Sequence, residues 1–254
     1  MDPIQATLLL AAGLLSGALN ALAGGGSLIA FSTLIGVGIP PLTAKMTNTV
    51  AVFPGNVASV AGGYRDLPAR REAVRILPAA LLGGVVGSVL LLLTPTGVFE
   101  LIVPFLVLAA SAVLALRNRL TGRVARTAGH RRRHPAARQA LVAVGGVYGG
   151  YVGASFGIVL LASLAFLQDE ALARTVAVKN LLLAAVSFTA VVLFVVLGHV
   201  EWSAVALLAP ATIVGGYGGA RLVRKLPEKL TRVVIVVFGT SFGLVLLWQN
   251  LRQP

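Results

Sequence analysis

The chain has 254 residues, of which 57% are hydrophobic and only 11% are charged. Apolar stretches near the length of about 20 residues that a membrane-spanning helix needs recur throughout it. We therefore predict an all-α polytopic membrane protein, and the lack of short alternating apolar segments argues against a β-barrel. Because there is no cysteine, disulfides, thiolate metal sites and redox dithiols are excluded.

The apolar segments follow one another along the chain, and the second is too short to span a bilayer alone. The N-terminus lacks a basic region, so we do not predict a cleaved signal peptide. The segments cover 4–23, 27–37, 43–62, 76–93, 98–116, 140–167, 172–197, 203–220 and 233–248.

Basic residues are concentrated in three short connections between these segments. Of the 21 Lys and Arg residues, four lie in 65–75, eight in 117–138 and five in 221–232. Cytoplasmic loops of membrane proteins carry such an excess. We expect these loops to face the cytoplasm and its anionic lipid headgroups, with both termini outside. The net charge of +13 therefore does not indicate a nucleic-acid partner.

The two halves of the chain match one another at a single fixed offset, which places Gly149 on Gly17. Prolines and an asparagine coincide as well as glycines, which are common in membrane helices. We predict two homologous halves, 1–116 and 140–254, joined by a basic linker at 117–139. The matching pairs include Gly17 and Gly149, Gly25 and Gly157, Asn48 and Asn180, Pro78 and Pro210, and Gly83 and Gly215.

Three apolar segments separate the second basic loop from the third, so one must enter and leave the membrane on the same side. Segment 140–167 is the best candidate because a run of glycines interrupts it, and by the repeat 4–37 breaks at Ala-Gly-Gly-Gly-Ser, 23–27. Irregular backbone at membrane depth needs surrounding protein or a wet cavity. Each half then crosses an odd number of times, which predicts inverted repeats with broken or re-entrant helices.

The residues around the two breaks form the candidate substrate-binding site. A helix that starts at a glycine-rich break directs free N–H groups and its positive dipole end toward the break, which attracts anions. The alternative is that the glycines serve close helix packing and the asparagines form interhelical hydrogen bonds. The candidate residues are Gly24, Gly25, Gly26, Ser27, Thr47, Asn48, Ser155, Gly157, Lys179 and Asn180.

Lys179 is the cation that we place deepest in a span, about 12 Å from its start at 1.5 Å per residue. An ionisable residue at such depth is a functional hypothesis by default. The alternative is a structural pair with Asp169 or Glu170. Lys45 lies nearer the end of a segment, from where its side chain could extend to the surface.

The stretch AGGGSLIAFSTLIGVGIPPLTAKMTNTVAV at 23–52, with a weaker echo at 149–181, resembles the TauE/SafE sulfite exporter family of membrane transporters. The similarity covers nearly the whole chain, including its two halves and the basic linker. It implies transport of small sulfur-containing anions, such as sulfite or sulfonated organic acids, across the cell membrane. The resemblance also implies coupling to an ion gradient, whereas the coupling ion, the direction and the oligomeric state stay open.

Two other functions fit parts of the sequence. A passive anion channel would also suit positive dipole ends and a buried lysine. An intramembrane serine protease would use Ser155, which lies in a Gly-x-Ser-x-Gly pattern, but its nucleophile needs a neighbouring base. The three histidines lie in the basic linker and at a segment end. Without a metal-ligand cluster or nucleotide fingerprint, we expect no enzyme activity, metal or cofactor.

Overall fold

The computed structural model describes residues 2–22, 24–99, 101–102, 105, 135–153, 156–157, 160, 164 and 172–222. Within these residues every regular element is a helix and there is no strand, which confirms the all-α prediction. The predicted segment 233–248, most of 98–116 and most of the linker lie outside them. The elements are α1 (Pro3–Leu22), α2 (Ser27–Gly36), α3 (Pro41–Gly62), the 3-10 helix η1 (Tyr64–Asp66), α4 (Arg70–Leu93), α6 (Pro135–Tyr151), α8 (Leu172–Leu197) and α9 (Trp202–Leu222).

Four of these helices, α1, α4, α8 and α9, have the length and apolar composition needed to cross a membrane, and α2 is a shorter apolar helix. Their outward surfaces expose large apolar side chains, such as Leu82 at 68% and Val196 at 73%. Soluble proteins rarely expose large apolar patches. This outer surface is therefore the part of the protein that lipid covers.

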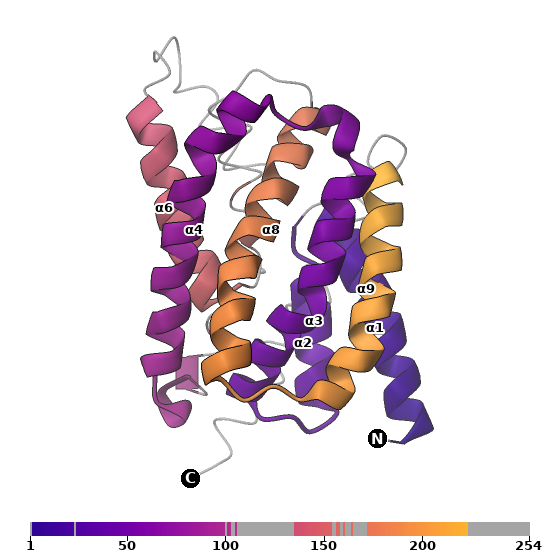
Figure 1. Ribbon diagram of the computed structural model, residues 1–254. Helices are drawn as coiled ribbons and strands as arrows, with labels where there is room; N and C mark the ends of the chain where they lie inside the picture. The colour runs from indigo at the N-terminus through magenta and orange to yellow at the C-terminus, as the bar shows by residue number, and fades with distance from the viewer. Residues whose placement is uncertain are drawn as a thin grey trace.

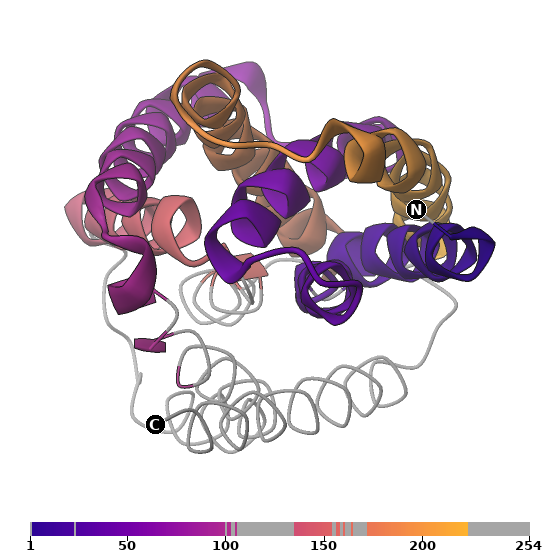
Figure 2. The ribbon, with the colours of Figure 1, turned by 90° about the horizontal axis from the view of Figure 1, so that it is seen from below.

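Helices α3 and α8 lie between two tightly packed pairs, α1 with α9 and α4 with α6 (Figure 1, Figure 2). Helices α1 and α9 run in the same direction, as the contacts of Gly13 with Leu208 and of Gly17 with Thr212 show. Figure 1 shows that α1, α3 and α9 begin at the same end of the bundle, where α2 ends. The segment from α1 to α2 therefore enters and leaves the bundle at one end.

Described basic residues of the first and third loops lie together at the opposite end. Arg65 and Arg221 line one surface pocket there. Arg174, at the start of α8, forms an ion pair of 2.9 Å with Glu72, at the start of α4. Helix α6 begins at this end as well (Figure 1). This grouping is the one that the positive-inside rule requires, while the side that faces the cytoplasm stays a prediction.

Equivalent contacts recur between the two halves, but the first helix of each half is shifted by three residues from the predicted register. The packed glycines of α9 follow those of α4 in the sequence by the predicted offset. The carbonyls that they touch lie in α1 and α6, and the sequence offset between these carbonyls is three residues shorter. The alignment of the two halves therefore needs a gap of three residues between the first helix and the rest of each half. The prediction that one fixed offset aligns the halves is wrong in this respect. Gly215 and Gly219 pack against the carbonyls of Leu14 and Ala18, as Gly83 and Gly87 pack against those of Ala143 and Val147.

Candidate functional site

The two helix breaks have the same backbone geometry. Two residues after the end of α1, Gly24 has a φ of +88°, and two residues after the end of α6, Gly153 has a φ of +70°. In both, the glycine N–H donates to the carbonyl five residues earlier, Leu19 at 3.1 Å and Tyr148 at 3.3 Å. Glycine populates positive φ without the steric cost of a Cβ. The backbone of each break therefore depends on a glycine at this position.

The two breaks touch each other. A Cβ added to Gly157 would lie 2.5 Å from the Cα of Gly24, so the two segments meet backbone to backbone. Gly26 lies equally close to α1, where its added Cβ would be 2.7 Å from the backbone nitrogen of Asn20. Gly25, which lies between Gly24 and Gly26 in the sequence, is also buried. Close packing, which the sequence left as an alternative, thus accounts for the glycines at these contacts.

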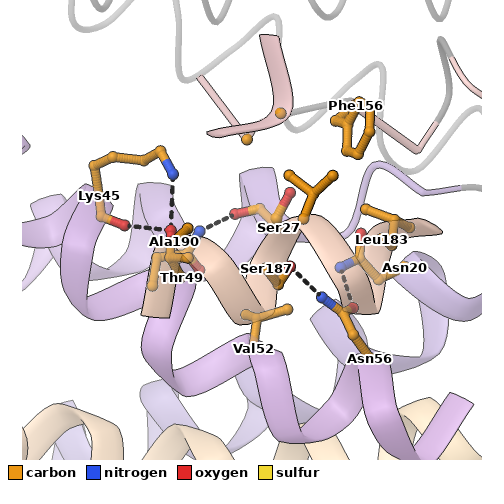
Figure 3. A pocket seen from close by; sticks show the side chains of 14 residues that line it. Asn20, Ser27, Lys45, Thr49, Val52, Asn56, Phe156, Leu183, Ser187 and Ala190 are labelled. Atoms are coloured by element: carbon orange, nitrogen blue, oxygen red, sulfur yellow. Dashed lines mark hydrogen bonds between the residues drawn. The ribbon is translucent and has the colours of Figure 1, made fainter. Parts of the chain in front are cut away.

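A cavity opens beside the breaks, between α3 and α8 (Figure 3). The centre of a water molecule can occupy about 30 Å³ of it, which is room for about two waters. Several predicted site residues are absent from its wall, and several residues that were not predicted are present. The lining residues are Asn20, Ser27, Lys45, Asn48, Thr49, Val52, Asn56, Gly149, Gly153, Phe156, Leu183, Val186, Ser187 and Ala190.

Amide side chains connect three helices across this cavity. Asn20 of α1 donates to Oδ1 of Asn56 in α3 at 3.1 Å, and Asn56 donates to the hydroxyl of Ser187 in α8 at 3.0 Å (Figure 3). Such interhelical hydrogen bonds contribute about 0.6–2 kcal/mol each inside a membrane. Among the described residues, Oδ1 of Asn20 is buried without a hydrogen-bond partner. It can therefore accept a hydrogen bond from water or a bound molecule.

Asn48 and Asn180 both donate hydrogen bonds to backbone carbonyls beside the first break. Asn48 donates to the carbonyl of Ser27 at 3.3 Å, and Asn180 donates to the carbonyl of Ala21 at 3.3 Å. Both amides therefore act as interhelical hydrogen-bond donors. Asn48 also lines the cavity, whereas Asn180 does not. Of this predicted pair, only Asn48 is placed to contact a molecule in the cavity.

Lys179 binds the end of α1 and does not line the cavity. Its side chain is fully buried, and Nζ donates to the carbonyls of Asn20 at 2.6 Å and Ala21 at 3.1 Å. The last carbonyls of a helix lack partners within the helix and form its negative end. Lys179 therefore caps α1. The predicted structural partners, Asp169 and Glu170, lie outside the described residues.

Lys45 is the lysine that lies in the cavity wall (Figure 3). The residue is only 3% exposed, so its side chain does not extend to the surface, although its position near the segment end would have allowed this. Nζ donates to the hydroxyl of Thr49 at 2.7 Å and lies 5.5 Å from the ring centroid of Phe194. Lys45, Thr49 and Asn56 recur on one face of α3 at helical spacing. This polar stripe in an apolar helix is the sequence signal that could have identified them.

The groups around the cavity favour an anion. Helix α2 begins at Ser27 in the cavity wall, and its positive dipole end points to that place. Lys179 offsets the opposing negative end of α1. The lining contributes the amino group of Lys45, which is positively charged when protonated, and no acidic side chain among the described residues. These contributions add to a positive potential in the cavity.

Of the two remaining predicted site residues, one has another role and the other is not described by the structure. Thr47 is buried, and its hydroxyl oxygen accepts the backbone N–H of Glu201 at 2.9 Å, so it anchors the connection between α8 and α9. Ser155, the nucleophile of the protease alternative, lies outside the described residues. Within the part of the chain that the structure describes, no cluster of three or more His, Asp and Glu side chains could hold a metal ion.

Comparison with known proteins agrees with this architecture. The family model described as sulfite exporter TauE/SafE matches residues 9–246. The probable membrane transporter protein YfcA of Escherichia coli K12 is 26% identical over 256 aligned positions, which span 100% of this chain and 93% of that protein. The probable membrane transporter protein of Haemophilus influenzae is 24% identical, across 91% of this chain and 90% of that protein. No solved structure matches the chain significantly. The chain therefore belongs to the sulfite exporter TauE/SafE family and is a multi-pass transporter of the cell membrane.

Proposed function

We propose that the protein is a secondary transporter of small anions and that the anion binds in the cavity beside the two breaks. The observation that carries this proposal is the composition of the described cavity wall, in which Lys45, amides and hydroxyls occur without an acidic side chain. An ion that leaves water loses a large hydration free energy. The ammonium of Lys45, which has three donors, and the start of α2 would replace part of that hydration.

The substrate class that fits best is sulfite or an organosulfonate. A sulfonate group combines one negative charge with several oxygen acceptors, and the wall supplies one ammonium together with neutral donors such as the Asn48 amide and the Thr49 hydroxyl. The description of the matching family as sulfite exporters supports the same class. Composition of the wall alone favours an anion and does not select sulfur.

We infer that the two halves are inverted repeats that move against each other during transport. The support is the repeated pairing of α1 with α9 and of α6 with α4, together with the antiparallel course of α3 and α8. Along that pair, Met46 lies beside Gly198 and Asn56 beside Ser187. In transporters built this way, broken helices meet at the substrate site and one repeat rocks against the other. A cavity with room for about two waters must widen to admit a sulfonate.

Reconstitution in proteoliposomes tests the proposal with sulfite, sulfate, sulfoacetate and chloride. We expect saturable counterflow of at least one sulfur anion, and its loss in Lys45→Met, which removes the charge but keeps most of the bulk. The matched control is Arg65→Met, which removes one charge from an exposed residue at the basic end and should transport normally. Ohmic single-channel currents would establish the channel alternative. Absence of flux for all four anions would refute anion transport.

A further inference from the structure

Lys45 differs from the other described basic residues of the helices in its surroundings. Lys179 is held by two carbonyls at the end of α1, and Arg174 is paired with Glu72 near the surface. Lys45 is buried, and among the described residues it contacts the neutral hydroxyl of Thr49, the ring of Phe194 and the backbone at Gly153. No carboxylate lies within ion-pair distance of Lys45 in the described part of the chain. Its charge is therefore not balanced by a described side chain.

Among the described residues, the surrounding elements place no second titratable group in the cavity wall. Helices α1 and α2 carry none, and none of the residues that line the cavity is acidic, histidine, tyrosine or arginine. The described titratable groups of the other elements packed around α3 all lie outside the lining. They are Arg174 and Lys179 in α8, Tyr217 and Arg221 in α9, Tyr148 and Tyr151 in α6, and His199 and Glu201 in the connection between α8 and α9.

We propose that Lys45 binds the coupling proton, so that one proton moves together with each anion. An ammonium buried without a counter-charge is costly inside a membrane, so the empty site holds the neutral amine. When an anion enters, the amine takes up one proton and forms an ammonium beside it. Both the empty and the loaded site then carry no net charge for a monoanion. This inference rests on the proposed anion site at the same cavity.

This arrangement predicts proton-coupled, electroneutral transport. Moving one elementary charge across the membrane potential changes the free energy by about 2.3 kcal/mol per 100 mV. A site without net charge is not driven by the potential in either the empty or the loaded state. A pH gradient, in contrast, drives the anion because every turnover carries one proton. The return of the empty site requires that Lys45 release its proton first.

Substitution by arginine separates the two functions of Lys45, because arginine keeps a positive charge at all accessible pH values. In proteoliposomes with sulfite, methanesulfonate or chloride on both sides, exchange needs only the loaded site, so Lys45→Arg should lower exchange much less than it lowers net efflux. With the anion on one side, net efflux needs the empty site to return, and it should fall about tenfold or more since the guanidinium cannot deprotonate. Lys179→Arg, the same change at the other buried lysine, should not separate the two modes.

Proton stoichiometry in the wild-type protein gives a second measurement that does not depend on a variant. Net uptake of methanesulfonate or chloride should be accompanied by about one proton per anion, and clamping the membrane potential should leave the rate unchanged. Net uptake by the wild type without proton movement would overturn the role of Lys45 while leaving the anion transporter intact. Equal exchange and net efflux in Lys45→Arg would do the same. Failure of all three anions to exchange would refute the underlying transport function.

Discussion

The contact between the two helix breaks can be tested by four single glycine-to-alanine substitutions that separate backbone strain from crowding. Gly24 has a positive φ and touches the opposite break, whereas Gly157 has the contact without a positive φ. Gly38 has a φ of +94° with no atom within 4 Å of an added Cβ, and Gly36 has neither constraint. The chain thus supplies a matched control for each effect.

The expected losses of unfolding free energy follow from these two effects. A positive φ costs an L-residue about 1–2 kcal/mol, which is the expected loss for Gly38→Ala. Crowding against backbone costs about 1–3 kcal/mol, the expected loss for Gly157→Ala. Gly24→Ala combines both effects and should lose about 2–5 kcal/mol. Gly36→Ala, at an exposed helix end, should stay within about 0.5 kcal/mol of the wild type.

Reversible unfolding in mixed detergent micelles, titrated with a denaturing detergent, measures these free energies for correctly inserted protein. The predicted order of stability is Gly36→Ala first, Gly38→Ala and Gly157→Ala next, and Gly24→Ala last. If Gly24→Ala unfolds at the same detergent fraction as Gly36→Ala, the two breaks do not pack on each other and the architecture of the site is wrong. A large loss in Gly38→Ala alone would show that φ, and not contact, dominates.

Lys179→Met should destabilise the protein by about 1–3 kcal/mol, because it removes the ammonium that donates to two buried carbonyls at the end of α1; an unchanged unfolding curve in detergent would remove the capping role. Substituting Arg174 by Gln breaks its ion pair with Glu72, whose side chain is 21% exposed while that of Arg174 is 41% exposed. Since such partly exposed pairs contribute about 0–1 kcal/mol, the same titration should detect little change, and a loss well above this range would contradict the estimate. In this cysteine-free chain, a cysteine replacing Arg65 should react with an impermeant reagent only from the cytoplasmic side, and one replacing Gly38 only from outside. Labelling of both from one side would refute the topology.

The sequence by itself determined the class of the protein and the position of its breaks. Long apolar segments require helices because a bilayer offers no partner to unpaired backbone groups. Three clusters of arginine and lysine predicted which helix ends share one end of the bundle, and the structure places Arg65 and Arg221, from the first and third clusters, together there. The glycines at 24–26 marked the first break correctly. In each case the signal is local, since segment length, charge and glycine content are read along the chain.

Tertiary structure alone decided which polar groups face the cavity. Depth along a helix favoured Lys179 over Lys45, but depth does not reveal which neighbour lies across from a side chain. Lys179 donates hydrogen bonds to carbonyls at the end of α1, a helix in the other half of the chain. The residues of α3 in the wall face α8 and the two breaks, and that packing depends on how distant helices pair.

The register of the repeat likewise could not be read from the sequence. The glycine pattern matched Gly25 with Gly157, whereas the helix ends, the positive-φ glycines and their carbonyl partners match Gly24 with Gly153. A glycine can match another glycine by composition, but a backbone conformation is fixed by the contacts that require it. At these breaks the requirement comes from the opposite half of the molecule, where Gly157 lies against Gly24.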